Sequence, residues 1–533
     1  MEDAKKPSEQ TTYSNPVLYA DYSDPDVIRV GEDYYMVSSS FTYLPGVPLL
    51  HSKDLVHWEL INYCVKTLPF AKYSRPSHGS GTWAPSIRFH NGCFYVFVPL
   101  VDEGILVARS TNPYEEFQKN LLCESKGWID PCPLWDDDGK AYMVFAYSYS
   151  RSGIRHRLAV AEIDPDCRRL VGTPRVIFNG ELAAPVAEGP KFYRRNGEYL
   201  ILMPAGGVAQ GWQACLKARD VYGPYEYRVV MHQGNTAVNG PHQGGWVTAP
   251  DGRDWFLHFQ DVHELGRIIH LQPMGFINGW PFIGQDQNGD GIGEPVARWE
   301  MPTKGMPRYQ IPQSDDFSSE TLGLQWQWQA NPDAENYSLT ARPGCLRLYC
   351  RRNQERENLL WYAPNVLTQI PQHPALTMTV KLSLHGDQTG DFGGIGIVGQ
   401  EYGYIGLYQA DGGMEIRCYQ GRVTEKEFEG KAEESCVYRC PIRESSTDSA
   451  EEISAGSEDS AYVWLRLEIR EDKTYRLSWS ADGSRFTAAQ WEYRLQRATW
   501  TGAKLCLWSC ARENRYSSGY CDYAYVEIAD ILP

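Results

Sequence analysis

The chain has 533 residues and a formal net charge of −16, because 51 Lys and Arg face 67 Asp and Glu. This length exceeds one ordinary core, and roughly 100 to 200 residues per domain predict two to four units. Hydrophobic residues make up 42% of the chain, without an apolar run near the ~20 residues of a membrane span, which excludes a membrane protein. The acidic balance and the lack of a basic stripe argue against nucleic acid as a partner.

The first residues, MEDAKKPSEQTTYS, are polar, and we expect a disordered segment over residues 1–14. This stretch has no apolar core of the kind that signal peptides carry. It suits a cytoplasmic start and also a mature N-terminus left after processing, so both locations stay open.

Aromatic residues make up 13% of the chain, beside 48 Gly and 33 Pro. With few long helix-like stretches, this composition predicts an all-β protein with many turns. The 14 cysteines show no CxxC pair and no zinc-like spacing, and many fall in apolar runs such as GCFYVFV. We therefore interpret most of them as buried free thiols.

Five segments share one layout: a short polar stretch with Pro or Gly, an apolar strand, a tight turn and an aromatic-rich strand. They read SDPDVIRVGEDYYMVSSS, WAPSIRFHNGCFYVFVP, IDPCPLWDDDGKAYMVFAY, AEGPKFYRRNGEYLILMPA and PHQGGWVTAPDGRDWFLHF. Their lead residues are 60, 46, 58 and 54 positions apart: Asp24, Ala84, Asp130, Glu188 and His242. These intervals fit one four-stranded blade each and predict a five-bladed β-propeller over residues 15–302.

Four of the five lead residues are ionisable: Asp24, Asp130, Glu188 and His242. The first strand of each propeller blade lines the central channel, so the lead residues should meet at one mouth of it. Capping of turns is the ordinary role of a lone Asp or Glu before Pro or Gly. Three clustered carboxylates indicate chemistry instead, because crowded like charges are costly. A facing pair can cleave a glycosidic bond, and a third raises the pKa of the acid.

The segment from Asp286 to Glu294, DQNGDGIGE, imitates the first half of a calcium loop. However, Ala297 stands where the closing Glu belongs, and no helix pattern flanks the segment. We interpret it as a polar turn, with a structural calcium ion as the alternative.

The repeat stops after Pro302, and we expect a Pro-containing linker over residues 303–314. Alternating apolar and polar runs then predict a β-sandwich, or jelly roll, over residues 315–533. Within it, the acidic, Ser-rich stretch 441–461 predicts a long mobile surface loop. Packing against the propeller is the role we favour for the sandwich. Sugar binding, to which Trp326, Trp328 and Trp361 could contribute, is the alternative.

The motifs of the first half resemble those of glycoside hydrolase family 43, from about Asn15 to Pro302. They are SDPD at Asp24, WAP at Trp83, IDP at Asp130, EGP at Glu188 and SSSFTYLPGVPLLHSKDLVHW from Ser38. The family consists of inverting five-bladed propeller enzymes, and the second half resembles the concanavalin-like sandwich appended to many of them. The resemblance implies Asp24 as general base, Glu188 as general acid, and Asp130 as the residue that tunes the acid's pKa and orients substrate.

The same resemblance implies further residues around the sugar. Phe41 and Trp83 match aromatic pocket walls, with ordinary blade packing as the alternative. Arg267 matches an arginine that bonds sugar hydroxyls, with a surface ion pair as the alternative. His242 matches a histidine near the axis, close to a bound calcium or water cluster in many relatives, and a satisfied core histidine is the alternative. We expect no required metal or cofactor.

From this resemblance we expect an exo-acting, inverting glycosidase that releases terminal α-L-arabinofuranosyl residues from plant cell-wall polysaccharide side chains or oligosaccharides. β-D-Xylosidase activity, alone or combined with the first, is the alternative. NGWPFIGQDQNGDGIGEPV resembles arabinofuranosidase-rich branches from gut bacteria, which implies a periplasmic or secreted protein of a Gram-negative bacterium, with the cytoplasm as alternative. Endo-cleavage of arabinan and a non-catalytic carbohydrate-binding propeller are competing functions. Inversion predicts the Asp24 and Glu188 carboxyls roughly 6.5–9.5 Å apart, and less than about 5.5 Å would indicate retention.

Overall fold

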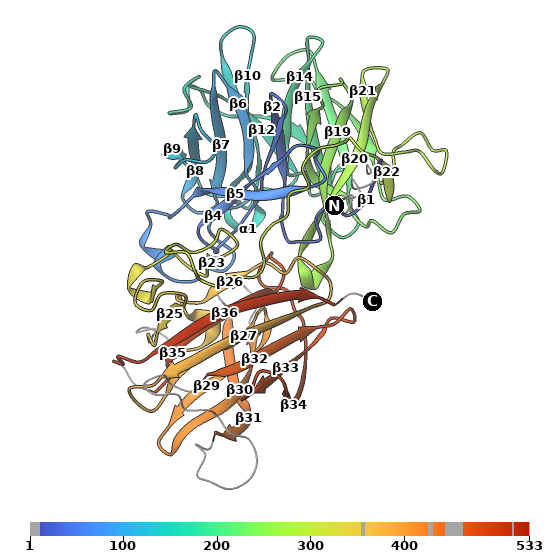
Figure 1. Ribbon diagram of the computed structural model, residues 1–533. Helices are drawn as coiled ribbons and strands as arrows, with labels where there is room; N and C mark the ends of the chain where they lie inside the picture. Colours follow the sequence, from blue (N-terminus) through green and yellow to red (C-terminus); the bar gives the residue numbers. More distant parts are fainter. Residues whose placement is uncertain (1–10, 353–357, 425–429, 443–461, 514–515, 532–533) are drawn as a thin grey trace, which may run out of the picture.

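The computed structural model describes residues 11–352, 358–424, 430–442, 462–513 and 516–531. It has a propeller above a sandwich, with the chain passing once from one to the other (Figure 1). The predicted all-β fold, a five-bladed propeller followed by a β-sandwich, is confirmed. Within the described residues, the helical segments are short: η1 (Ala71–Ser74), α1 (Tyr149–Ser152), η2 (His263–Leu265), η3 (Ala334–Asn336) and η4 (Leu360–Tyr362).

Each blade is a four-stranded antiparallel sheet whose strands follow one another in the chain. Blade one holds β2 (Asp26–Val30), β3 (Asp33–Val37), β4 (Gly46–Ser52) and β5 (Trp58–Val65), and blade two β6 (Ser86–His90), β7 (Cys93–Leu100), β8 (Gly104–Ser110) and β9 (Gln118–Glu124). Blade three holds β10 (Trp128–Trp135), β11 (Ala141–Tyr147), β12 (Arg157–Ile163) and β13 (Arg175–Asn179). Blade four holds β14 (Lys191–Arg195), β15 (Glu198–Ala205), β16 (Trp212–Ala218) and β17 (Glu226–Met231), and blade five β18 (His242–Thr248), β19 (Asp254–Asp261), β20 (Arg267–Ile277) and β21 (Trp280–Ile283).

The first two strands of a blade are joined by the tight turns that the sequence predicts. In blade two, Asn91 and Gly92 have φ angles of 46° and 76°, and in blade four Asn196 and Gly197 have 51° and 78°. Two successive positive φ values are typical of a type I′ turn, whose twist matches that of the flanking strands. Asn-Gly therefore fixes the register of each hairpin and so the position of the residues that precede it.

The N-terminal segment is more ordered than we expected. Thr12–Ser14 forms β1, which pairs antiparallel with β22 (Arg298–Glu300), so the expectation of disorder over residues 1–14 is wrong for these residues. The side chain of Tyr13 is 1% exposed, and its hydroxyl donates to the Leu271 carbonyl at 2.9 Å. Burial of this ring against blade five explains why a short polar stretch is held. Residues 1–10 lie outside the described residues.

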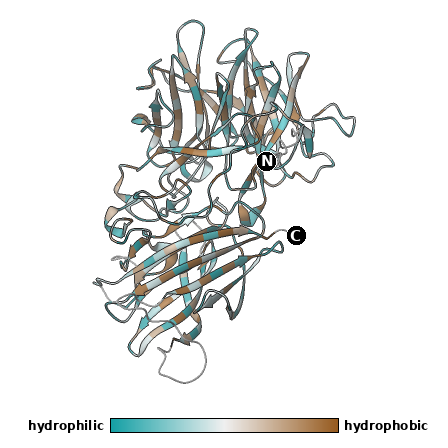
Figure 2. Cartoon of the chain, in the orientation of Figure 1, coloured by the Kyte–Doolittle hydropathy of each residue, from teal (hydrophilic) through white to brown (hydrophobic). Residues whose placement is uncertain are grey.

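The sandwich consists of two seven-stranded sheets. In spatial order, one sheet holds β23 (Gln327–Trp328), β26 (Leu367–Gln369), β35 (Lys504–Ala511), β28 (Asp391–Val398), β29 (Glu401–Ala410), β30 (Gly413–Thr424) and β31 (Lys431–Pro441). The other holds β24 (Tyr337–Ser338), β25 (Leu346–Tyr349), β36 (Tyr520–Asp530), β27 (Leu376–His385), β32 (Val463–Ile469), β33 (Thr474–Ser480) and β34 (Thr487–Arg494). In β32 buried and half-buried residues alternate, and its Val, Leu and Ile side chains point into the core between the sheets. Apolar residues accordingly concentrate on the strands of both domains (Figure 2).

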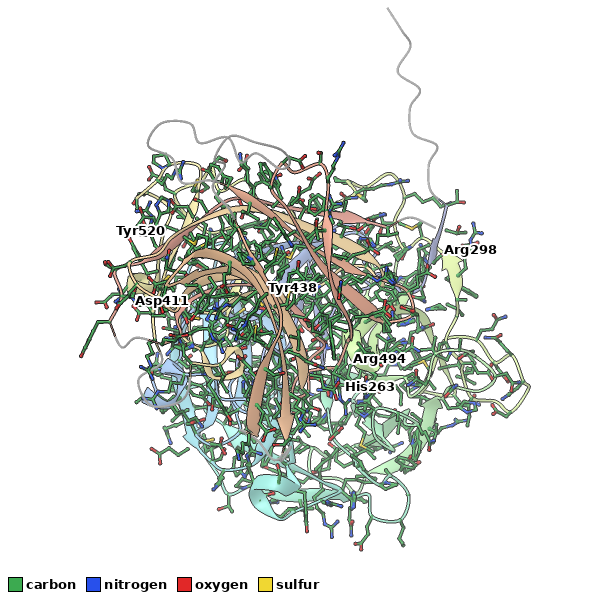
Figure 3. All side chains as sticks on the ribbon, turned by 90° about the horizontal axis from the view of Figure 1, so that it is seen from below. His263, Arg298, Asp411, Tyr438, Arg494 and Tyr520 are labelled. Carbon is green, nitrogen blue, oxygen red and sulfur yellow. The ribbon has the colours of Figure 1, made fainter. Side chains whose placement is uncertain are left out.

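The view from the sandwich side places Tyr438 of β31 near the centre and Arg298 of β22 at the edge of the propeller (Figure 3). Pro441 ends β31, and residues 443–461 of the expected mobile loop 441–461 lie outside the described residues. All fourteen cysteines are free, and ten of them are buried, as the sequence predicted.

The three tryptophans considered for sugar binding are buried. Trp326 and Trp328 are 2% and 3% exposed and belong to the sandwich core, while Trp361 is 1% exposed and stacks on His78 of the propeller with 3.6 Å between ring centroids. Trp328 also exchanges two backbone hydrogen bonds with Leu44 of blade one. The Trp361 ring and the Trp328 backbone therefore join the two domains, and the three buried rings offer no free face to a sugar.

Candidate active site

A cavity of about 490 Å³ opens where the first strands of the blades begin. Its walls include six of the seven predicted site residues: Asp24, Phe41, Trp83, Asp130, Glu188 and Arg267. The seventh, His242, lies directly behind Glu188, with 3.4 Å between its Nε2 and Glu188 Oε1. The structure therefore brings together all seven residues that the sequence predicted for the site.

The repeat position of blade four differs by one residue from our alignment. Asp24, Asp130 and Gly189 each precede a proline and have φ angles of 56°, 55° and 55°. Gly189, and not Glu188, is thus the equivalent of the two aspartates, and the expected placement of three carboxylates at one repeat position is wrong for Glu188. Glu188 reaches the cavity from the preceding residue.

Glycine suits position 189 for two reasons. Its φ of 55° lies in the left-handed region, which glycine adopts without steric cost. A Cβ there would also lie 2.8 Å from Cδ of Gln243, closer than real Cβ contacts. The small residue lets the backbone pass close to blade five, so the neighbouring Glu188 side chain turns into the cavity.

Asp24 is buried and oriented by two donors. Its Oδ1 accepts a 2.9 Å hydrogen bond from Arg267 Nη1, and its Oδ2 accepts one from the Ser39 hydroxyl. Arg267 is itself fixed, since its backbone N–H donates to Asp21 Oδ1 at 2.9 Å. The alternative of a surface ion pair for Arg267 is wrong, because the guanidinium lies in the cavity wall with its side chain 14% exposed.

Asp130 is 4% exposed and accepts a 2.7 Å hydrogen bond from the Gly189 backbone N–H at Oδ2. Burial raises the pKa of Asp130 to about 6, and the Asp24 carboxylate adds to the rise, while the Gly189 N–H opposes it. The hydrogen bond also ties blade three to the residue that follows Glu188.

The pKa of Glu188 is raised further than that of Asp130. Burial is the largest cause of the rise, and repulsion from Asp130 is the second. Together with repulsion from Asp24, they raise the pKa of Glu188 to about 8, while the Arg267 charge opposes the rise. Burial also lowers the pKa of His242 to about 3, with Arg267 contributing, so its ring is neutral near pH 7. A neutral His242 supplies no positive charge to Glu188, which therefore keeps its proton at neutral pH.

Three aromatic rings line part of the cavity wall. Phe41 lies between β3 and β4 of blade one, Trp83 leads into blade two, and Trp500 comes from the sandwich. The ring centroids of Trp83 and Trp500 are 4.5 Å apart, and those of Phe41 and Trp500 6.0 Å. Our sequence reasoning missed Trp500, because it belongs to the other domain and to no motif.

The sandwich loop that carries Trp500 is docked on the propeller by its backbone. The Gly502 N–H donates to Asp21 Oδ2 at 2.8 Å, and the Ala503 N–H donates to the Glu264 carbonyl at 2.8 Å. A Cβ on Gly502 would lie 2.4 Å from the Leu265 carbonyl carbon, so glycine permits this close approach. Asp21 thus links the loop of Trp500 to the Arg267 that orients Asp24.

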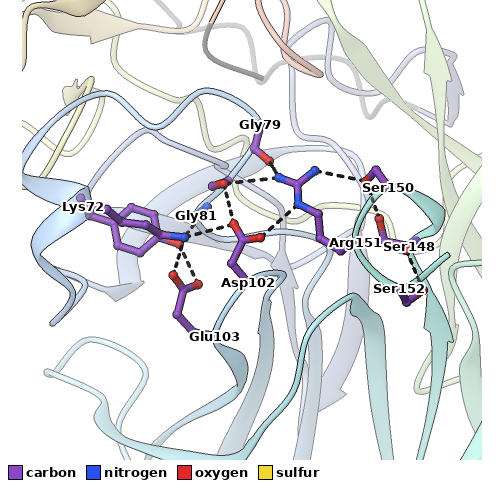
Figure 4. Close-up of polar contacts among 11 residues, drawn as sticks. Lys72, Gly79, Gly81, Asp102, Glu103, Ser148, Ser150, Arg151 and Ser152 are labelled. Atoms are coloured by element: carbon purple, nitrogen blue, oxygen red, sulfur yellow. Dashed lines mark hydrogen bonds and ion pairs between the residues drawn. The ribbon is translucent and has the colours of Figure 1, made fainter. Parts of the chain in front are cut away.

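A polar network holds the rim beside Trp83 (Figure 4). Arg151 of α1 donates from Nε to Asp102 Oδ1 at 3.1 Å and from Nη2 to the Gly79 carbonyl at 2.9 Å. Its guanidinium carbon also lies 5.7 Å from the centre of the Trp83 ring. Lys72 adds an ion pair to Asp102 at 3.1 Å. The network fastens α1, which lines the cavity, to blade two.

Within the described residues, no group of three His, Cys, Asp or Glu side chains is placed to hold a metal ion. In the segment from Asp286 to Glu294, Asp286 accepts hydrogen bonds from the backbone N–H groups of Gly289 and Gly291, and Asp290 accepts one from Ile292. The side chains thus cap their own loop, as in the polar turn that we expected. No described helix is both long and apolar enough to cross a membrane.

Comparison with known proteins decides the family. The model for "Glycosyl hydrolases family 43" matches residues 13–281, and that for "Beta xylosidase C-terminal Concanavalin A-like domain" matches residues 314–529. The chain belongs to glycosyl hydrolase family 43. Members of family 43 need no cofactor, and they act on carbohydrate.

Several relatives of this family 43 protein carry names. A putative beta-xylosidase of Xylanibacter ruminicola is 40% identical over 74% of this chain and 72% of its own length. A beta-xylosidase of Formosa agariphila is 31% identical over 67% and 64%, and a non-reducing end alpha-L-arabinofuranosidase of Bacteroides ovatus is 30% identical over 64% and 65%. The solved structure of a bifunctional GH43-CE protein of Bacteroides eggerthii has a TM-score of 0.81 and 28% identity, over 99% of this chain and 64% of that chain. The chain thus spans about two thirds of most of these proteins.

Proposed function

We propose that this family 43 protein is an exo-acting, inverting glycosidase that removes one terminal pentose, with Asp24 as general base and Glu188 as general acid. The observation that carries the proposal is the convergence of the Asp24, Asp130 and Glu188 carboxyl groups on one cavity, in which burial and the Asp130 charge raise the pKa of Glu188. A carboxyl group that holds its proton at neutral pH can donate it to a leaving oxygen.

The reaction begins with the pentose in the cavity and its glycosidic oxygen beside Glu188. Asp24, oriented by Arg267 and Ser39, takes a proton from a water molecule as this water attacks the anomeric carbon from the opposite side. Glu188 gives its proton to the leaving oxygen. Asp130 maintains the raised pKa of Glu188 through charge repulsion and positions the Gly189 backbone that turns Glu188 inward.

The aromatic wall supports removal of a single terminal residue. Trp500 from the sandwich packs on Trp83 and closes one side of the cavity, so a polysaccharide chain cannot continue through it in that direction. Cleavage within an arabinan chain needs an open groove and is disfavoured by this wall. A purely carbohydrate-binding propeller has no need for a carboxyl group with a raised pKa.

The names of the relatives support two candidate sugars for the terminal residue. β-D-Xylose is the first candidate, since the relatives at 40% and 31% identity are named beta-xylosidases. α-L-Arabinofuranose, which the sequence led us to expect, is the second, since the relative at 30% identity is named for that activity.

The direct experiment measures kcat/KM of the purified chain on 4-nitrophenyl β-D-xylopyranoside and 4-nitrophenyl α-L-arabinofuranoside. We expect hydrolysis of at least one, and the larger constant assigns the sugar. The Asp24→Asn variant, purified in the same way, controls for contaminating glycosidases. Release of nitrophenol from neither substrate, together with binding of the free sugars, would support the carbohydrate-binding alternative and overturn the proposal.

A further inference from the structure

The mouth of the cavity carries a stacked pair of side chains on the turn between β11 and β12. Tyr149 of α1 is 54% exposed, and the guanidinium carbon of Arg155 lies 3.7 Å from the centre of its ring. Both residues line the cavity. At this distance the guanidinium is in van der Waals contact with the ring face, and stacking of this kind leaves its in-plane N–H donors available to a ligand.

Among the described residues, Arg155 differs from the other arginines near the cavity because no carboxylate is paired with it. Arg267 is paired with Asp24 at 2.9 Å, Arg151 with Asp102 at 3.1 Å, and Arg157 with Glu181 at 3.6 Å. Among the described residues, the Arg155 guanidinium has the contact with Tyr149 and no ion pair. On a chain of net charge −16, an unmatched cation at the mouth of a cavity attracts anions locally.

His156 provides a second hydrogen-bond donor next to Arg155. His156 lines the cavity, and its Nδ1 accepts a 2.6 Å hydrogen bond from the Val186 backbone N–H. A ring nitrogen that accepts an N–H carries no proton, so in the neutral ring the proton is on Nε2. Among the described residues, no partner takes that Nε2–H, and it is free to donate to a ligand.

The position of Arg155 and His156 assigns them to one side of the scissile bond. His156 is bonded to Val186, which lies two residues before Glu188 in the same segment. The His156 carbonyl also accepts the Gly180 N–H at 2.7 Å. Arg155 and His156 therefore border the segment that carries Glu188, the group that protonates the leaving oxygen in the proposed function.

We propose that Arg155, stacked on Tyr149 and assisted by His156, is a leaving-group subsite that binds a carboxylate. Its ligand is an acidic saccharide, in which a uronic acid lies on the leaving side of the bond to the terminal pentose. A carboxylate matches the fork of the guanidinium and can accept two parallel hydrogen bonds from it. This inference rests on the proposed function, because it takes Glu188 as the group that protonates the leaving oxygen.

The test compares two leaving groups of similar shape on the pentose that the enzyme accepts: 4-carboxyphenyl and 4-carbamoylphenyl glycosides. For the wild type and each variant, the ratio of kcat/KM on the carboxyl substrate to that on the carbamoyl substrate is measured. The difference in intrinsic reactivity cancels when ratios are compared between variants. We expect the ratio to fall about fivefold in Arg155→Gln, because a partly exposed charge-assisted hydrogen bond is lost, and to fall in the wild type on addition of 0.5 M NaCl.

Arg168→Gln is the matched control. Arg168 lies in the loop that joins β12 to β13, at the end of these strands away from the cavity, and its side chain is 64% exposed. This variant removes the same charge and should leave the ratio unchanged, whereas Arg155→Lys should keep part of the preference. An equal ratio in the wild type and Arg155→Gln overturns the subsite while leaving the glycosidase proposal intact. Failure of the wild type to cleave either substrate overturns the proposed function, and the subsite with it.

Discussion

The replacement Glu188→Ala provides the sharpest test of a single residue. General acid catalysis contributes roughly 10²- to 10⁴-fold, and its contribution depends on how much the leaving oxygen needs a proton. On a pentosyl disaccharide or an alkyl pentoside we expect kcat/KM to fall about 10³-fold. On a 2,4-dinitrophenyl pentoside, whose phenolate leaves without protonation, we expect a loss below about tenfold.

The pH profile adds a second readout to this prediction. Burial and the Asp130 charge raise the pKa of Glu188 to about 8, so the acid form persists through neutral pH and is lost above pH 8. Wild-type kcat/KM should therefore fall about tenfold per pH unit on the alkaline side of pH 8, and Glu188→Ala should lack this limb. Glu181→Ala, which removes a carboxylate with a side chain 64% exposed, serves as control and should keep both the rate and the limb. Equal losses of Glu188→Ala on both leaving groups would refute the reasoning.

Three further variants test the rest of the cavity. Asp24→Ala should reduce turnover by at least about 10³-fold on good and poor leaving groups alike, because water activation is needed for both, and substantial residual rate on either would exclude the base role. Asp130→Asn should move the alkaline limb of kcat/KM to lower pH, since it removes the repulsion that raises the pKa of Glu188; an unmoved or higher limb contradicts this coupling. Trp500→Ala should lower kcat/KM about tenfold or more, because the sugar loses contact with this ring. Trp491→Ala is the control, since Trp491 is 44% exposed on β34 of the same domain, and it should leave kcat/KM unchanged. Equal effects of the two variants would show that the loss is a general effect on the sandwich.

The propeller was predictable because each blade repeats a local pattern. The apolar strand, the Asn-Gly or similar turn and the aromatic strand are all contiguous in sequence, and each fixes its own hairpin. The same locality put Asp24 and Asp130 at one mouth of the channel. The one-residue offset at Glu188 was missed because the start of a strand cannot be placed to within a residue from sequence. Alignment of Pro190 with Pro25 and Pro131 would have indicated it.

Features that depend on distant residues could not be predicted in this way. Trp500 reaches the cavity through backbone hydrogen bonds of Gly502 and Ala503 with the propeller, and nothing local to its turn indicates that contact. β1 forms because Thr12–Ser14 meets β22 at the far end of the propeller sequence. The raised pKa of Glu188 likewise results from burial and from neighbours on other blades.

The stereochemistry of the first product tests the central claim most directly. If Asp24 activates water on one side of the sugar while Glu188 protonates the leaving oxygen on the other, hydrolysis inverts the anomeric carbon. Proton NMR spectra, recorded during the first minutes of hydrolysis before mutarotation, should show the pentose anomer opposite to that of the substrate. First release of the pentose with the anomeric configuration of the substrate would contradict the account.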